Sequence, residues 1–267
     1  MSGPAGGAGA ERIAAAFAQS GKRAALMPYL MGGFPDLPTS QAIAGAYADG
    51  GADLVELGVP FSDPLADGPV IHAAGTAALR AGATLDGVLQ VAAAVADRVA
   101  VVVMCYANVV LARGPEQFAA DLVAAGVSGL IVPDLPLEEA TPLREACDDA
   151  GIALVPLVAP TTPDARLRLI GARARGFLYT VAVTGTTGER PGDANGVAGV
   201  IRRAKAATSV PVALGFGIAT PEQAGAAADA GAGGVIVGSR LVRAAAEAED
   251  PAAEVRGLVT AFAQALS

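Results

Sequence analysis

The sequence predicts a TIM (β/α)8 barrel with an extra N-terminal helix. Short apolar runs alternate with alanine-rich segments along the chain, which is the pattern of repeated βα units. Several alanine-rich segments pass into the next apolar run through a sequence such as "AAGVSGLIVP" or "DAGAGGVIVG". The first glycine in each suits the left-handed conformation that ends a helix. The runs are apolar throughout, as expected for parallel strands that are covered on both faces.

The elements are expected in the following order. The stretch "ERIAAAFAQS" (11–20) predicts the extra helix. Strands are expected over residues 24–31, 53–59, 99–106, 129–134, 153–159, 177–183, 210–217 and 234–239. Residues 1–10 are expected to form a disordered tail and residues 11–267 a single barrel domain. A doubly wound open sheet is the alternative, but no GxGxxG follows the first strand, which disfavours its dinucleotide-binding version.

Composition excludes several classes of protein. The longest strongly apolar stretch (99–106) is far shorter than the roughly 20 residues of a membrane helix, and the first residues lack the pattern of a signal peptide. The net charge of −8, without any basic run, argues against a nucleic-acid or anionic-membrane surface. Without a secretory signal, Cys105 and Cys147 are expected to be free buried thiols. We therefore expect a cytoplasmic protein.

The last two strand ends predict a phosphate site, because a TIM barrel binds its substrate at the C-terminal ends of its strands. Gly215 and Gly217 allow backbone N–H groups to approach a ligand closely. Gly238 and Ser239 open directly into a helix, whose N-terminus favours an anion. A tight βα turn would explain either pair alone. Both pairs together, after the seventh and eighth strands, indicate phosphate binding.

The second strand and the loop after it carry the candidate catalytic acids. Alternation along the strand places Val55 and Leu57 toward the helices and Glu56 inside the barrel. Burial raises the pKa of a carboxyl group, so Glu56 is suited to give and take a proton; a structural, paired glutamate is the alternative. The loop "PFSDPLADGP" is stiffened by its prolines and carries Asp63 and Asp67. The residues alone leave open which aspartate acts, or whether both only cap turns.

Other chemistries are poorly supported. His72 is the one histidine, which excludes a zinc site built from several histidines, and we expect it to be an ordinary loop or helix residue. The two lysines, Lys22 and Lys205, do not lie at strand C-terminal ends, which disfavours a Schiff-base aldolase. The acids lack the clustered pattern of a Mg²⁺ site, although such a site stays open. We expect acid–base chemistry on a small phosphorylated substrate, without a cofactor.

The chain resembles the α subunits of tryptophan synthase. The stretch "LVELGVPFSDPLADGP" (54–69) is similar to that family's signature almost letter for letter. The resemblance continues through "MCYANVV", "VPDLPLEE", "TGTTGER", "LGFGIATPEQ" and "VGSRLV". It covers nearly everything from the first strand onward, with motifs at successive barrel ends. The resemblance implies retro-aldol cleavage of indole-3-glycerol phosphate into indole and glyceraldehyde 3-phosphate, a step of tryptophan biosynthesis.

The resemblance also implies roles for individual residues. Glu56 would move the protons, Asp67 rather than Asp63 would hold the indole N–H, and Tyr179 would lie beside Glu56. The residues implied to bind the phosphate are Gly188, Gly217, Gly238 and Ser239. Those implied to line the indole pocket are Tyr29, Ile71, Met104, Tyr106 and Ile131. Thr187 matches a hydroxyl group on a loop, "VTGTTGERPG" (183–192), that closes over the site.

Three departures from the family are visible. Thr186 stands where a valine is commonest, Tyr29 stands where the family often has phenylalanine, and the first ten residues have no counterpart. They affect the details of the loop and the polarity of the pocket, and not the reaction.

A partner is implied as well. The family forms an α₂β₂ complex with a β subunit that carries pyridoxal phosphate and receives indole through a tunnel, so no cofactor is expected in this chain. The loop that carries Asp67 and the segment 108–110 are the expected contact surfaces. Two alternatives remain at this point: another phosphate-binding barrel lyase or isomerase, and a non-catalytic activator of the β subunit.

Overall fold

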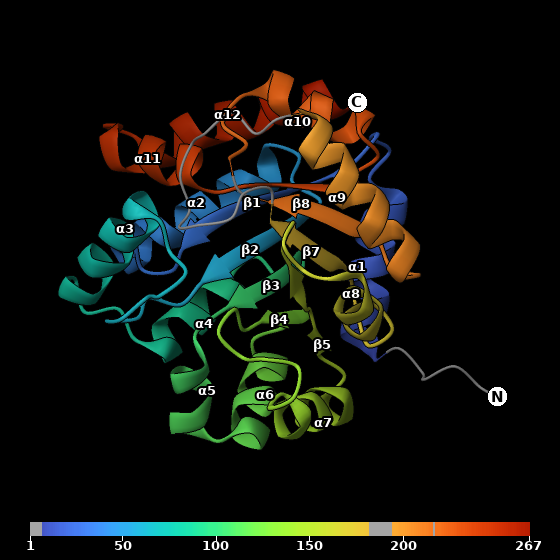
Figure 1. Ribbon diagram of the computed structural model, residues 1–267. Helices are drawn as coiled ribbons and strands as arrows, with labels where there is room; N and C mark the ends of the chain where they lie inside the picture. Colours follow the sequence, from blue (N-terminus) through green and yellow to red (C-terminus); the bar gives the residue numbers. More distant parts are fainter. Residues whose placement is uncertain (1–6, 182–193, 216) are drawn as a thin grey trace.

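Parallel strands form the centre of the protein, and helices surround them (Figure 1). The computed structural model describes residues 7–181, 194–215 and 217–267. The strands are β1 (Ala25–Met31), β2 (Leu54–Gly58), β3 (Ala100–Met104), β4 (Gly129–Ile131), β5 (Ala153–Leu154), β6 (Leu157–Val158), β7 (Leu178–Val181), β8 (Val212–Gly215) and β9 (Gly234–Val237).

Helices separate most of these strands along the chain. They are α1 (Ala8–Gln19), α2 (Leu37–Asp49), α3 (Pro69–Arg80), α4 (Leu85–Ala93), α5 (Ala107–Arg113), α6 (Pro115–Ala124), α7 (Thr141–Ala150), α8 (Asp164–Gly171), α9 (Ala194–Ala207), α10 (Pro221–Asp229), α11 (Ser239–Glu247) and α12 (Pro251–Leu266). Several start at side-chain caps: Asp36 accepts a hydrogen bond from the N–H of Thr39, and Thr220 and Gln223 form a capping box.

The sheet closes on itself through the segment that contains β5 and β6. The strand order is β5-β4-β3-β2-β1-β9-β8-β7-β6, so its two ends are consecutive pieces of one stretch of chain. The N–H of Val155 donates to Leu130 on one side (2.8 Å), and the carbonyl of Pro156 accepts from Tyr179 on the other (3.0 Å). The predicted TIM (β/α)8 barrel is confirmed. Its fifth strand is split into two pieces, because Pro156 has no N–H to donate.

Helix α1 covers the N-terminal end of the barrel. Ile13 is fully buried among residues of the barrel interior, and the ring of Phe17 lies 5.7 Å from that of Phe177. The guanidinium of Arg12 donates to the backbone carbonyls of Ala96 and Val99. The helix starts at Ala8 rather than at residue 11, so residues 8–10 belong to the helix and not to the expected tail. The assignment of residues 11–267 to a single domain stays a prediction.

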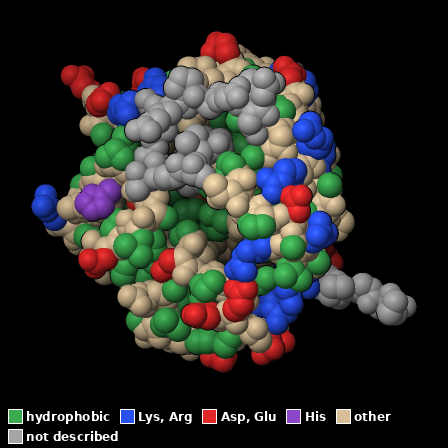
Figure 2. Space-filling model, viewed as in Figure 1, with side chains coloured by type: hydrophobic (Ala, Val, Ile, Leu, Met, Phe, Trp, Pro, Cys, Tyr) green, Lys and Arg blue, Asp and Glu red, His purple; other side chains and the backbone are tan. Residues whose placement is uncertain are grey.

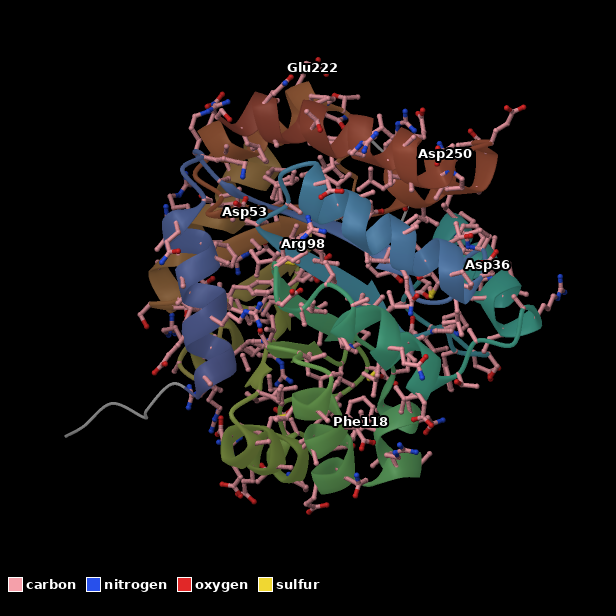
Figure 3. All side chains as sticks on the ribbon, turned by 180° about the vertical axis from the view of Figure 1, so that it is seen from behind. Asp36, Asp53, Arg98, Phe118, Glu222 and Asp250 are labelled. Atoms are coloured by element: carbon pink, nitrogen blue, oxygen red, sulfur yellow. The ribbon has the colours of Figure 1, made fainter. Side chains whose placement is uncertain are left out.

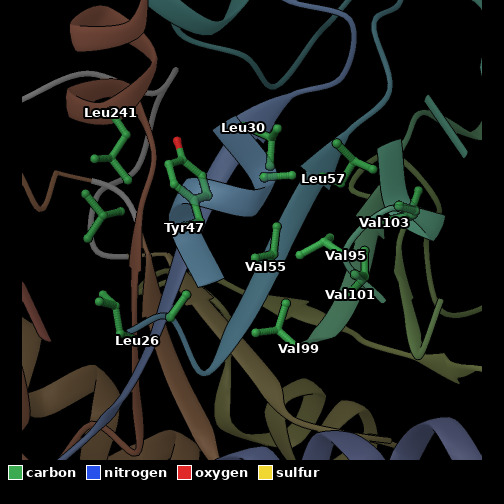
Figure 4. Packing of buried hydrophobic residues seen from close by; sticks show 14 of the residues in the cluster. Leu26, Leu30, Tyr47, Val55, Leu57, Val95, Val99, Val101, Val103 and Leu241 are labelled. Carbon is green, nitrogen blue, oxygen red and sulfur yellow. The ribbon is translucent and has the colours of Figure 1, made fainter. Parts of the chain in front are cut away.

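The outer faces of the strands pack against the helix layer. Val55 and Leu57 point toward Leu30, Tyr47 and the helices (Figure 4). Glu56, between them on the opposite face of β2, therefore points into the barrel, as the alternation of the sequence predicts.

The side chains at the N-terminal ends of the strands are structural. Lys22 donates to Asp53 (2.8 Å), which also accepts from the N–H of Leu26 (2.7 Å); Asp53 is labelled in Figure 3, which shows this side. Cys105 and Cys147 are free and buried, as predicted. Among the described residues, none of the helices is both long and apolar enough to span a bilayer.

Candidate active site

A cavity of about 870 Å³ lies at the C-terminal ends of the strands. Figure 2 shows a hollow in this face, with hydrophobic side chains inside it and Lys or Arg side chains along one border. The cavity brings together most of the residues that the sequence singled out. Those that line it are Tyr29, Glu56, Asp67, Ile71, Met104, Tyr179, Gly217, Gly238 and Ser239.

Glu56 is a buried carboxyl group that faces this cavity. Its side chain comes from the middle of β2 and the residue is 1% exposed. Its Oε2 atom has no hydrogen-bond partner within the part of the chain that the structure describes. Burial, and after it the charge of the nearby Asp67, raise the pKa of Glu56 to about 8. Near neutral pH the group is therefore mostly protonated, and it has a free oxygen at which to exchange a proton.

Asp67 is the aspartate that reaches the cavity. It is half-buried and lines the cavity wall, whereas Asp63 is exposed and accepts a hydrogen bond from the hydroxyl of Ser62 (2.6 Å). Burial raises the pKa of Asp67, while a hydrogen bond from Tyr106 and the charge of His72 lower it. The choice that the residues alone left open thus falls on Asp67.

Tyr106 holds Asp67 in place. Its hydroxyl group donates to Oδ1 of Asp67 (2.9 Å) and accepts from the backbone N–H of Ala66 (3.0 Å). Its ring stacks on Phe61 of the same loop at 5.4 Å. The resemblance placed Tyr106 in the indole pocket, but this residue does not line the cavity. It lies behind the loop and fixes the carboxylate that does.

Two tyrosine rings share the interior with Glu56. The ring of Tyr29 occupies the space above Gly58, and that of Tyr179 the space above Gly215, so that a Cβ at either glycine would overlap a ring. Burial, with the charge of Glu56 second, raises the pKa of Tyr179 well above its usual value and keeps the phenol neutral. The ring of Tyr179 thus fills the space that a side chain at Gly215 would take, and the expectation that the N–H of Gly215 approaches a ligand stays a prediction.

The expected phosphate residues lie together at one side of the cavity. Gly217 has φ +86°, a conformation that favours glycine. Gly238 precedes α11, and Ser239 is its first residue, so the helix N-terminus faces the cavity wall that both residues form. Gly188 and Thr187 lie outside the described residues, and their roles stay predictions.

The structure also shows where Ile131 and His72 lie relative to the cavity. Ile131 is fully buried in the barrel core and does not line the cavity. His72 is an exposed residue of α3, in agreement with the view of it as an ordinary helix residue. Among the described residues, no group of three or more His, Cys, Asp or Glu side chains could hold a metal ion.

One wall of the cavity was not predicted as part of the site. This wall is built from residues that follow β4 and β6, and it includes Leu135, Leu137, Arg144, Arg166 and Arg173. Helices α7 and α8 contain none of the glycine-rich or acidic motifs that indicated a site at the other strand ends. These arginines could have been predicted from the sequence, because they follow strands whose C-terminal ends face the site.

Comparison with known proteins places the chain in a family. The family described as "Tryptophan synthase alpha chain" matches residues 15–266. The chain belongs to the tryptophan synthase alpha chain family. It is 49% identical to the tryptophan synthase alpha chain of Synechococcus elongatus over 222 residues, which cover 82% of this chain and 84% of that one. It is 46% identical to that of Phenylobacterium zucineum, covering 96% and 95%.

A solved structure agrees with this assignment. A chain of Mycobacterium tuberculosis tryptophan synthase is 37% identical and superposes with a TM-score of 0.89, covering 96% of this chain and 98% of that one. The resemblance to the alpha subunits of tryptophan synthase is therefore confirmed. Neither alternative, a different barrel lyase or a non-catalytic activator, is favoured by these matches.

Proposed function

We propose that this cavity cleaves indole-3-glycerol phosphate to indole and glyceraldehyde 3-phosphate, with Glu56 moving the protons and Asp67 stabilising the cationic intermediate. The observation that carries the proposal is the buried Glu56, whose Oε2 is unpartnered among the described residues and whose cavity also contains Asp67. Membership of the family supports the choice of reaction.

The proton transfers follow from the states of the two acids. Protonated Glu56 donates its proton to C3 of the indole ring, and the ring nitrogen becomes cationic. The carboxylate of Asp67, held by Tyr106, stabilises this charge at the N–H group. The Glu56 carboxylate then accepts the proton of the side-chain hydroxyl. The carbon–carbon bond breaks, its electron pair returns to the indole ring, and the hydroxyl carbon becomes the aldehyde.

The remaining lining residues are proposed to bind the substrate. Gly217, Gly238 and Ser239 form the side of the cavity that suits the phosphate. Tyr29, Ile71 and Met104 supply the apolar surface for the indole ring, and Tyr179 lies against Glu56.

The partner is the tryptophan synthase β subunit, which is proposed to hold the pyridoxal phosphate, while this chain holds no cofactor of its own. The complex is proposed to be α₂β₂ and to work in the cytoplasm. Two large apolar side chains are exposed near the expected contact surfaces: Leu65 on the loop of Asp67 (80% exposed) and Leu111 on α5 (68%). Such side chains suit a protein interface.

The test is indole release from indole-3-glycerol phosphate by the purified chain, alone and with a β subunit. We expect Glu56→Gln to abolish release under both conditions, because an amide cannot exchange the proton. Glu249→Gln, which changes an exposed loop glutamate, is the matched control and should behave as the wild type. Absence of indole with wild type and partner, or equal release by Glu56→Gln, would reject the proposal.

A further inference from the structure

One wall of the cavity carries positive charge that the proposed reaction does not use. Arg144 on α7, Arg166 on α8 and Arg173 just after α8 line the same cavity as Glu56 and Ser239. In the closed ring of strands, β4, which precedes α7, lies half-way round from β9, which precedes α11. Arg144, in the first turn of α7, therefore lies across the opening from Gly238 and Ser239, whereas Arg166 and Arg173 follow β6, the next strand position after β4.

The three arginines differ in how they are paired. Arg166 donates two hydrogen bonds to Glu138, at 2.7 and 2.9 Å. Arg173 acts on Glu138 at longer range, and both arginines lower the pKa of that carboxyl group to about 2. Arg144 is half-buried, and its backbone N–H donates to the carbonyl of Ala140 (2.8 Å), but its guanidinium group forms no hydrogen bond or ion pair with any residue that the structure describes. Arg144 and Arg173 thus have guanidinium groups that are not held in close ion pairs.

Among the described residues, the acids that line the cavity are Glu56, Asp67 and Asp134. Glu56 is mostly protonated near neutral pH, and Asp67 lies on the loop after β2. Asp134 accepts a hydrogen bond from the N–H of Ala107 at the start of α5 (2.9 Å). The chain as a whole carries a net charge of −8, which repels a phosphate dianion. Local positive charge at the opening offsets that repulsion, since a charged cleft concentrates ligands of opposite sign.

We propose that Arg144 and Arg173 form an electrostatic capture site, which attracts the phosphate of an incoming substrate before it reaches Gly217, Gly238 and Ser239. This inference rests on the proposed function, because it takes the substrate to be a phosphate ester. The two arginines act on arrival and not on bond cleavage. Their removal therefore lowers the association rate constant and leaves kcat unchanged.

Direct measurement of association is possible because the chain contains no tryptophan. Indole fluorescence then reports the ligand alone. The probe is 3-(indol-3-yl)propyl phosphate, which carries the ring and the phosphate but has no hydroxyl group to be cleaved. Stopped-flow mixing gives its association rate constant with wild type, with the double variant Arg144→Gln/Arg173→Gln, and with Arg98→Gln. Arg98 is exposed near the N-terminal end of β3 and pairs with Asp49, so this control removes a charge from the opposite side (Figure 3).

At about 0.01 M ionic strength, where the Debye length is about 30 Å, the double variant should associate about tenfold more slowly than wild type. At about 1 M the Debye length is about 3 Å and the difference should vanish. Arg98→Gln should remain close to wild type. The uncharged probe 3-(indol-3-yl)propan-1-ol should associate equally with all three proteins, which also shows that the variants keep a folded cavity.

The outcomes separate the two proposals. Wild-type association by the double variant at low salt, or an equal loss with the uncharged alcohol, overturns the capture site while leaving the reaction intact. If the double variant associates more slowly in a salt-dependent manner, the capture site is supported. If wild type at the same time releases no indole, the proposed reaction is rejected. A wild type that does not bind the phosphate probe overturns both.

Discussion

The sequence predicts the position of the Glu56 side chain but not its surroundings. Alternation along the strand predicts that its side chain enters the barrel, and the structure agrees. The sequence could not show that Oε2 is unpartnered among the described residues, or that Asp67 lies close enough to raise the pKa. Both depend on where the loop after β2 folds back, which local sequence rules do not specify.

The raised pKa of Glu56 predicts a pH-dependent cost in stability. An acid whose pKa rises on folding, here from 4.5 to about 8, binds its proton more tightly in the folded state. The cost is absent below the unfolded pKa, grows with pH and is complete above the folded pKa. Glu56→Gln should therefore raise the free energy of unfolding by on the order of 4 kcal/mol at pH 8 and change it little at pH 4.

Urea unfolding of both proteins across that pH range measures this difference. Glu249→Gln, at an exposed position, should show no such trend. A constant difference between Glu56→Gln and wild type at all pH values would mean that Glu56 does not titrate as proposed.

Tyr106 gives a second prediction at the scale of the residue. Tyr106→Phe keeps the stacking on Phe61 but removes the hydrogen bond to Asp67. We expect kcat for indole release to fall about tenfold, since hydrogen bonds to charged groups contribute about 1.5–3 kcal/mol. The pKa of Asp67 should rise, because this hydrogen bond lowers it, and the acidic limb of the pH–rate profile should move to higher pH.

Tyr47→Phe is the matched control for this positioning role. It removes a buried hydroxyl group that bonds the carbonyl of Tyr29 (3.0 Å) rather than Asp67, so it should leave the acidic limb in place. An unmoved acidic limb in Tyr106→Phe would limit that residue to a structural role. The resemblance implied a place for Tyr106 in the indole pocket, whereas its stacking on Phe61 and its hydrogen bond to Asp67 depend on tertiary contacts that the sequence does not show.

At the scale of the element, glycines at strand ends make room for rings from neighbouring strands. Gly58 on β2 accommodates Tyr29 of β1, and Gly215 on β8 accommodates Tyr179 of β7. A strand sequence read alone assigns such a glycine to a turn or to a ligand. Only the pairing of neighbouring strands shows which side chain takes the space.

Gly215→Ala should therefore disturb the site through its neighbour. The added Cβ would overlap the ring of Tyr179, so we expect a loss of about 1–3 kcal/mol in stability and a loss of indole release. Gly199→Ala in α9 is the control, because a Cβ there meets no atom within 4 Å and alanine favours a helix by about 1 kcal/mol. Wild-type stability and activity in Gly215→Ala would contradict the packing described here.

At the scale of the whole molecule, the repeated βα pattern was enough to predict the barrel. The eight apolar runs map onto its eight strand positions, and the helix before the first strand is α1. Details that depend on tertiary contacts were not predictable. The fifth strand is interrupted near Pro156. Helix α1 begins at Ala8 and not at residue 11, and the N–H of Gly9 donates to the carbonyl of Gly151 (2.8 Å). The cavity wall that contains Arg144, Arg166 and Arg173 was not predicted, because these residues lie in or just after helices and not in strand-end motifs.

The exposed leucine of α5 gives a prediction about assembly. Leu111 is 68% exposed and follows the segment 108–110 that is expected to contact the β subunit. Leu111→Ser should weaken the partner's affinity about tenfold, as loss of one apolar interface anchor does, with the activity of the isolated chain unchanged. Titration of indole release with the β subunit measures this. Val123→Ser, a 48% exposed position on α6, is the control, and an equal effect of both would remove Leu111 from the interface.

The packing of α1 has a consequence for the order of events in turnover. Ile13 and Phe17 fill the N-terminal end of the barrel, so substrate and both products travel through the C-terminal end alone. A β subunit docked at the proposed contact surfaces, the loop of Asp67 and Leu111, would lie beside this same opening. A new substrate molecule can therefore enter only after the products of the previous turnover have left through that opening.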